Sequence, residues 1–306
     1  MCSGELMKKI LVYLSNENQP SLFDLIVAYD SDVDAVIPYG NISKDDITDM
    51  VYGCIFTRRP KKLINTAILI GGNDSDLADK MMKKAKKTFF GDFKVSIMAD
   101  PNGNSTTSAA TVAKIKDYME DLNGVKIVVL AGTGPVGERV SVLMHREGAD
   151  VILTSRKQEK AEKVCNKIKE KYDRDVTPMQ VSNDAECLEA VKGAEVVVAT
   201  GKAGIQLMSK EVWSQVPSIK VLADVNAYPP AGIEGVDAQD NGKEVDGKHL
   251  FGAVAIGDIK TKAMRDVIRK MYEEKGAYMD LERIYDITWE SLAEKKKRYE
   301  KGDKIM

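Results

Sequence analysis

The sequence predicts an α/β protein of two domains, each built on a largely parallel β-sheet. From residue 9 onward, short runs of β-branched residues alternate with longer segments of helical period, a pattern typical of strands joined by crossover helices. The chain has 306 residues, which is enough for about two domains of ~150 residues. A complete strand–helix–strand pattern begins again at residue 125, so the second domain is predicted to be Rossmann-like.

In the first domain, apolar runs predict strands at residues 10–14, 35–38, 66–70 and 94–99. Helical segments separate the strands, and each begins with Ser, Asp or Pro, as helices commonly do. These segments cover residues 20–29, 43–52 and 74–89. A longer helix is expected over 106–122, because its apolar residues recur at spacings of three and four.

The second domain begins with a strand at 126–130, a glycine-rich loop, a helix that ends near Gly148, and a strand at 151–153. Further strands are predicted at 176–181, 195–200, 220–224 and 250–256. Helical period returns through residue 275 and again from about residue 280. We expect these C-terminal helices to return to the first domain. The predicted domains are therefore 1–122 with 262–306, and 123–261.

The composition argues against several classes of protein. Lys and Arg number 45 against 47 Asp and Glu, a balance that does not suit electrostatic binding of nucleic acid. Apolar runs are far shorter than the ~20 residues that span a bilayer, and no disulfide or metal-ligand spacing appears. The first six residues resemble an extension before Met7 and not a signal peptide, and lysine-rich 295–301 is interpreted as a solvated helix end. We expect a cytoplasmic protein without nucleic-acid, membrane or metal partners.

The glycine-rich loop fits the GxGxxG pattern between an apolar strand and an amphipathic helix. It consists of Gly132, Thr133, Gly134, Pro135, Val136 and Gly137. In this context Gly132 permits a tight turn, Gly134 lets the backbone approach a pyrophosphate, and Gly137 lets the helix pack on the strand. Free N–H groups at the helix start also favour a phosphate. We expect the loop to bind a dinucleotide, and the alternative is a glycine-rich turn without a ligand.

The residues after the next strand favour NADP over NAD. NAD sites place an Asp or Glu there for the ribose 2′-hydroxyl, whereas this chain has Ser155, Arg156 and Lys157, with Lys160 one turn later. These donors suit a 2′-phosphate. The alternative is a solvated helix start, although basic residues at that position oppose the helix dipole.

Two further loops are expected at the same edge of the sheet, because each follows a predicted strand. Gly201 lies in the loop after 195–200, and Asp224 ends the strand at 220–224. Ligands of such sheets bind at the carboxyl ends of the strands, so both residues are candidates for the nicotinamide side of a cofactor site. Asp224 fits a turn cap equally well.

The first domain carries two polar clusters that a hydrophobic core does not explain. Residues 18–24 follow the first strand and residues 100–107 follow the fourth, so both are expected at strand carboxyl ends. Their amides and hydroxyls suit the donors and acceptors of a heterocycle, although Asn102 also fits a turn and Thr106 a helix cap. Lys260 follows the last predicted strand, at the start of the C-terminal helix.

Taken together, these motifs resemble the NADP-dependent methylene-tetrahydromethanopterin dehydrogenases, which are related to the methylene-tetrahydrofolate dehydrogenases. The resemblance runs from about Met7 to Tyr285. The matching segments are PSLFD at 20–24, YGN at 39–41, FFG at 89–91, DPNGNSTT at 100–107, VLAGTGPVG at 129–137, RK at 156–157, DVNAYPP at 224–230 and FGA at 251–253, with Lys260.

The resemblance implies hydride transfer from 5,10-methylene-tetrahydromethanopterin to NADP, which gives the methenyl pterin and NADPH in one-carbon metabolism. It also implies a homo-oligomer, a trimer or hexamer, with the reduced pterin between the two domains, and a functional lysine at the position of Lys260. On this basis the residues expected nearest the chemistry are Lys260, Asp100 and Asn102. Those expected to bind the pterin are Ser21, Asp24, Asn104, Thr106 and Thr107.

Three features depart from the family pattern. They are the six-residue extension, the charged tail beyond Tyr285, and Pro101 within the second polar cluster. Pro101 leaves the choice of pterin open. One alternative is a tetrahydrofolate-specific dehydrogenase. The acidic tail of its substrate would then meet the basic residues Arg58, Arg59, Lys61 and Lys62. The other is a non-catalytic NADP-binding sensor, although a sensor has no need of the cluster at 100–107.

Overall fold

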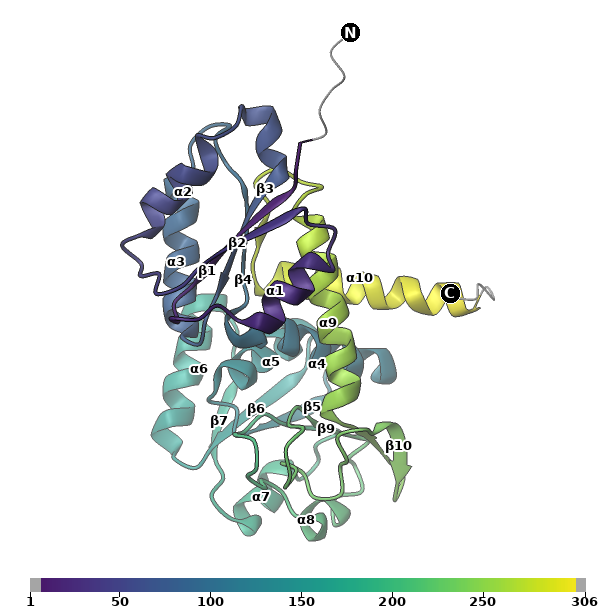
Figure 1. Ribbon diagram of the computed structural model, residues 1–306. Helices are drawn as coiled ribbons and strands as arrows, with labels where there is room; N and C mark the ends of the chain where they lie inside the picture. The colour runs from purple at the N-terminus through teal and green to yellow at the C-terminus, as the bar shows by residue number, and fades with distance from the viewer. Residues whose placement is uncertain (1–6, 301–306) are drawn as a thin grey trace. The chain divides into compact units, whose positions relative to one another are not determined.

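The computed structural model describes residues 7–300. The expected extension at residues 1–6 and the last residue of the lysine-rich segment lie outside this range. The chain forms two compact α/β units (Figure 1), one that combines residues up to Thr106 with those from Thr261, and one that spans Thr107–Lys260. The sequence placed these boundaries after residues 122 and 261, whereas the first change of unit falls inside a helix.

The first unit is a five-stranded parallel sheet in the order β12-β4-β3-β1-β2. Its strands are β1 (Ile10–Ser15), β2 (Ala35–Tyr39), β3 (Thr66–Gly71), β4 (Ser96–Ala99) and β12 (Tyr278–Met279). Its helices are α1 (Leu22–Tyr29), α2 (Ile47–Ile55), α3 (Ser75–Thr88) and α10 (Leu281–Glu300). Because β12 pairs with β4, the C-terminal segment returns to the first unit, as predicted.

The core of the first unit forms because β1 and β3 are buried on both faces, as continuous apolar strands of parallel sheets are. On one face, Val12 and Leu14 pack with Val51 of α2 and Met81 of α3. In Figure 1, α1 lies on the other side of this sheet from α2 and α3. The helix starts are fixed locally, since Asp74 accepts a hydrogen bond from the N–H of Leu77 at 2.9 Å.

The second unit is a seven-stranded sheet in the order β10-β11-β9-β8-β5-β6-β7. Its strands are β5 (Lys126–Leu130), β6 (Asp150–Ser155), β7 (Thr177–Gln180), β8 (Val196–Ala199), β9 (Val221–Asp224), β10 (Asn241–Val245) and β11 (Lys248–Phe251). Its helices are α5 (Pro135–Arg146), α6 (Gln158–Tyr172), α7 (Asp184–Val191) and α8 (Lys210–Ser214). All pairings are parallel except that of β10 with β11, and the strand order reverses beside β5, where ligands of such sheets bind.

Two helices cross the limits of the units, namely α4 (Asn104–Met119) and α9 (Ala253–Lys270). The strand predicted over 250–256 is confirmed only at its first two residues, because β11 (Lys248–Phe251) ends at Phe251 and α9 begins at Ala253. Alanine has the highest helix propensity, so Ala253 and Ala255 extend a helix where the apolar run alone indicated a strand. Among residues 7–300, no helix is both long enough and apolar enough to cross a membrane.

Candidate functional site

The glycine loop joins β5 to α5 and is held in place by the end of the neighbouring strand β6. The N–H of Ala131 donates to Thr154 Oγ1 at 3.1 Å, and the N–H of Gly132 donates to the Thr154 carbonyl at 2.9 Å. Ala131 has a φ of 51°, a left-handed conformation that side-chain-bearing residues rarely adopt. Thr154 therefore stabilises the turn that starts the loop.

The three glycines of the loop have different reasons to lack a side chain. A Cβ on Gly137 would lie 2.5 Å from the Cα of Gly132, and one on Gly132 would lie 2.8 Å from Leu153. These two glycines are required by the chain's own packing. A Cβ on Gly134, the N-cap of α5, would meet nothing within 4 Å, so the open space beside Gly134 is available to a ligand at the helix N-terminus.

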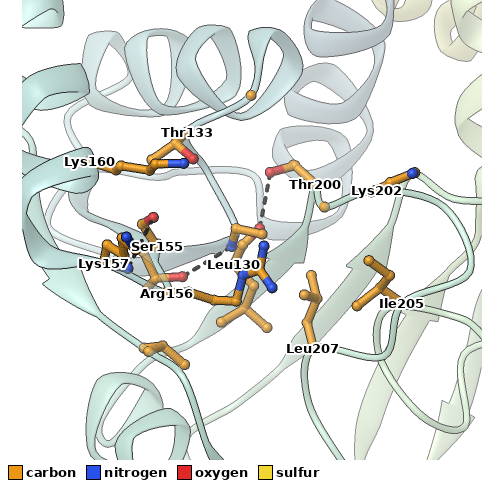
Figure 2. A pocket seen from close by; sticks show the side chains of 15 residues that line it. Leu130, Thr133, Ser155, Arg156, Lys157, Lys160, Thr200, Lys202, Ile205 and Leu207 are labelled. Atoms are coloured by element: carbon orange, nitrogen blue, oxygen red, sulfur yellow. Dashed lines mark hydrogen bonds between the residues drawn. The ribbon is translucent and has the colours of Figure 1, made fainter.

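A pocket of about 570 Å³ opens beside this loop. It is lined by Leu130, Ala131, Thr133, Gly134, Thr154, Ser155, Arg156, Lys157, Lys160, Val181, Thr200, Gly201, Lys202, Ile205 and Leu207. Figure 2 shows Lys157 and Lys160 on the side of α6, and Lys202 across the pocket near Ile205. Loops after β5, β6, β7 and β8 all contribute, as expected at the switch point of the sheet.

The charge of the pocket is entirely positive. Its lining includes Arg156, Lys157, Lys160 and Lys202, and it includes no Asp or Glu. Within residues 7–300, none of these four cationic groups has a carboxylate partner at ion-pair distance. Cations without carboxylate partners around an open cavity favour an anionic ligand, and the set fits the several phosphates of NADP.

The predicted cofactor residues do not all line this pocket. Those that do are Thr133, Gly134, Ser155, Arg156, Lys157 and Gly201, whereas Gly132, Pro135, Val136, Gly137 and Asp224 are not part of the lining. Asp224 is buried, and its two oxygens accept hydrogen bonds from the N–H groups of Asn226 and Ile233, both at 3.0 Å. Burial raises the pKa of Asp224, and its contacts are those of a turn anchor.

In the first unit, Asp100 caps the N-terminus of α4. One of its oxygens accepts from the N–H groups of Ser105 at 2.8 Å and Thr106 at 3.1 Å, and the other accepts from the Thr106 hydroxyl at 2.6 Å. Asn104 is also buried and donates to the Ser75 hydroxyl at 2.9 Å. These contacts give three predicted pterin residues, Asp100, Asn104 and Thr106, a role in fixing the start of α4.

The other predicted pterin residues differ in setting. Asp24 is buried and accepts a hydrogen bond from the Tyr13 hydroxyl at 2.8 Å, while Ser21 caps α1 and accepts from the N–H of Asp24. Asn102 is exposed with a φ of 51°. Thr107 and Lys260 belong to the second unit, at the two ends of its chain segment. Lys260 lies on α9 and is partly buried.

Sequence reasoning missed several residues that line the pocket. Thr154 and Thr200 have their hydroxyls committed to the chain itself, since Thr200 Oγ1 donates to the Leu130 carbonyl at 3.1 Å. Lys202 was not singled out, but it belongs to the loop 201–204 after β8, which was expected at the site because it follows a strand carboxyl end. Ile205 and Leu207 carry no pattern that separates them from other apolar loop residues.

The fold and the site define an α/β protein of the dinucleotide-binding class. A family model described as methylene-tetrahydromethanopterin dehydrogenase, N-terminal, matches residues 22–102. Bifunctional protein MdtA of Methylorubrum extorquens is 42% identical over 286 residues, which are 93% of this chain and 99% of that protein. The NAD(P)-dependent methylenetetrahydromethanopterin dehydrogenase of the same organism is 32% identical over 88% of this chain and 93% of its own length. The chain belongs to the methylene-tetrahydromethanopterin dehydrogenase family.

Solved structures support the fold alone. Quinate dehydrogenase from Corynebacterium glutamicum, in complex with NAD, has a TM-score of 0.52 at 9% identity, with 93% of this chain and 99% of that chain covered. Ornithine carbamoyltransferase from Gloeobacter violaceus has a TM-score of 0.55, also at 9% identity, with 86% of each chain covered. The second example is a transferase by name, so the shared architecture does not by itself specify a reaction.

Proposed function

We propose that this protein transfers a hydride from 5,10-methylene-tetrahydromethanopterin to NADP, giving methenyl-tetrahydromethanopterin and NADPH. Family membership supports the pterin substrate. The observation that carries the choice of NADP is the pocket lined by four cations and no carboxylate. A carboxylate that would bind a 2′-hydroxyl would repel a 2′-phosphate, whereas Arg156 and its neighbouring lysines attract one.

In this proposal the protein's main task is positioning. Loss of hydride from a carbon between two nitrogens leaves a cation that the nitrogens themselves stabilise. When bound, NADP supplies the nicotinamide that accepts the hydride. Gly134 and the N-terminus of α5 would hold the pyrophosphate, and Arg156 with Lys157 the 2′-phosphate. Such fixed geometry lowers a barrier by removing the entropy cost of bringing the two reactants together.

For the pterin, we propose that Asp24 and Lys260 orient the ring. Asp24 is a buried carboxylate, which suits the N–H donors of a pterin. Lys260 would donate hydrogen bonds to the pterin and thereby affect how readily its carbon gives up a hydride. Asp100 would act through the start of α4, which its two oxygens hold in place.

The test is a spectrophotometric assay of the purified protein. Methylene-tetrahydromethanopterin and methylene-tetrahydrofolate would each be offered with NADP and with NAD, and reduced nucleotide would be followed together with the methenyl chromophore. Turnover with the methanopterin substrate and NADP is the expected result. Faster turnover with the folate substrate would instead favour the folate-specific alternative, and binding of NADP without any turnover would favour the sensor.

One observation weighs against a folate tail at Arg58 and its basic neighbours. The Arg58 guanidinium donates to the backbone carbonyls of Lys8 at 3.0 Å and Asn65 at 2.8 Å. Arg58 also lies between α2 and β3, at the edge of the sheet opposite the strand carboxyl ends that carry Asp24 and Asp100. Arg58 is therefore better explained as a support for the start of β3.

We also propose that the protein is a homo-oligomer, a trimer or hexamer, in the cytoplasm. Helix α1 exposes an apolar stripe of Leu22, Ile26 and Tyr29, each more than half exposed, and large exposed apolar groups on one face are typical of contact surfaces. Cys54, Cys165 and Cys187 are free thiols, which suits a reducing compartment. Light scattering of wild type and of Ile26→Glu would test the assembly, because the charge would shift the oligomer toward smaller species.

A further inference from the structure

A tyrosine in the middle of the first sheet contacts the carboxylate assigned above to the pterin. Tyr13 lies on β1 and its side chain is fully buried, with a relative exposure of 0%. Its hydroxyl donates to Asp24 Oδ2 at 2.8 Å, and Asp24 itself is only 4% exposed. Burial, followed by the nearby Asp24 charge, raises the pKa of Tyr13, so the phenol remains a donor across the physiological pH range.

A glycine in β3 makes room for this tyrosine. A Cβ on Gly71 would lie 2.0 Å from the Tyr13 hydroxyl. The strand register pairs Tyr13 with Leu69 and Ser15 with Gly71, so the phenol extends two residues along the sheet toward the carboxyl ends of the strands. Glycine inside a strand weakens it and commonly marks a close approach. Tyr13 and Gly71 are therefore matched to place one hydroxyl at the Asp24 carboxylate.

The hydrogen bond from Tyr13 constrains the direction of the Asp24 carboxylate. The terminal torsion of an aspartate is broad, so a carboxylate keeps one orientation only when its oxygens are held. The N–H of Asp24 donates to the Ser21 hydroxyl at 3.3 Å, which fixes the backbone of Asp24. Tyr13 fixes one oxygen of the Asp24 carboxylate. The charge of Asp100 also contributes, as the smallest cause, to the raised pKa of Tyr13.

We propose that Tyr13 is a positioning residue for the pterin reaction. Its hydroxyl fixes the direction of the Asp24 carboxylate, so that Asp24 presents a pre-oriented acceptor to the N–H groups of the reduced pterin. This inference rests on the proposed function, in which Asp24 orients the substrate. Tyr13 does not contact the substrate in this scheme, and its whole contribution passes through Asp24.

The test compares variants of the full chain by steady-state kinetics with methylene-tetrahydromethanopterin and NADP. Tyr13→Phe removes the hydroxyl, and Gly71→Ala displaces the phenol without removing it. Each is expected to lower kcat/KM for the pterin about tenfold, the effect of one hydrogen bond to a charged group, with the KM for NADP unchanged. The matched control is Tyr272→Phe, because the Tyr272 hydroxyl is also buried but has no hydrogen-bond partner among residues 7–300.

A double-mutant cycle shows whether Tyr13 acts through Asp24. If it does, Tyr13→Phe has no further effect on kcat/KM once Asp24→Asn is present. Additive losses, or an equal loss for pterin and NADP, would overturn the inference in favour of general damage to the fold. Wild-type pterin kinetics in Tyr13→Phe and Gly71→Ala would overturn it as well.

The same data separate this inference from the function on which it rests. If Asp24→Asn lowers kcat/KM for the pterin and Tyr13→Phe does not, the proposed function stands and Tyr13 has no part in it. Unaffected Asp24→Asn would remove both residues from pterin binding. Absence of pterin turnover in the wild-type protein, with NADP binding intact, would overturn the proposed function itself and the inference with it.

Discussion

Replacement of Arg156 by alanine tests the cofactor site most directly. Arg156 is exposed, lines the pocket and has no ion-pair partner among residues 7–300. Its removal therefore breaks no salt bridge of the chain, and we expect the free energy of unfolding to change little. The effect should appear in the binding of a 2′-phosphate alone.

The magnitude follows from the setting of the guanidinium. A hydrogen bond to a charged group contributes about 1.5–3 kcal/mol. Arg156 is exposed, and Lys157 and Lys160 remain in the pocket lining after its removal. We therefore expect the lower end of this energy range, because solvent and the remaining cations offset part of the loss. A loss of about 1.5 kcal/mol is about tenfold in Kd. NAD lacks the 2′-phosphate, so its Kd should not change. The ratio of the Kd for NAD to the Kd for NADP should therefore fall about tenfold.

The assay is calorimetric titration of NADP, NAD and adenosine 2′,5′-bisphosphate into wild type and Arg156→Ala. Lys163→Ala is the matched control, because Lys163 is an exposed cation on the same helix that does not line the pocket. Higher ionic strength should reduce the difference between wild type and Arg156→Ala. Equal weakening of NADP and NAD, or none for either, would refute the assignment of Arg156 to the 2′-phosphate.

Three further outcomes follow from the structure. Gly137→Ala should lower the free energy of unfolding by about 1–3 kcal/mol through overpacking, as measured by urea denaturation, whereas Gly134→Ala should unfold like wild type yet bind NADP more weakly. Lys260→Ala should lower kcat far more than it changes the Kd of NADP, and equal activity would remove Lys260 from the mechanism. Burial raises the pKa of Cys187 to about 12, so iodoacetamide at pH 8 should label it only after unfolding, as followed by peptide mass spectrometry.

The strands of the parallel sheets could be predicted because each is apolar over its whole length. β5 and β8 are buried on both faces, and such strands are continuous apolar runs. β10 is polar and mostly exposed, so apolar runs do not reveal it. The sequence feature that indicates β10 is the Asp-Gly pair that follows it, which is typical of hairpin turns. In the structure Asp246 and Gly247 both have positive φ, as such turns require.

The site was predictable to the extent that its residues act through local pattern. The glycine loop and the cations after β6 each form a short run in the sequence, and both runs contribute residues to the pocket lining. Asp100 and Asp224 were predicted from position, but sequence could not show that their oxygens accept N–H donors two to nine residues away. Tyr13 carries no pattern at all, because an aromatic residue in an apolar strand is indistinguishable from core until Asp24 is placed beside its hydroxyl.

The placement of charge in the two units agrees with the proposed reaction. The cofactor pocket holds cations that are exposed and lack carboxylate partners, so they remain available to phosphates. The first unit instead buries two acidic side chains, Asp24, which accepts from the Tyr13 hydroxyl, and Asp100, which holds the start of α4. Loss of a hydride makes the pterin more positive, and fixed negative charge near a developing cation lowers the barrier more when it is pre-oriented than when it must reorganise. A carboxylate that Tyr13 already holds in one direction would need less reorganisation as this cation develops.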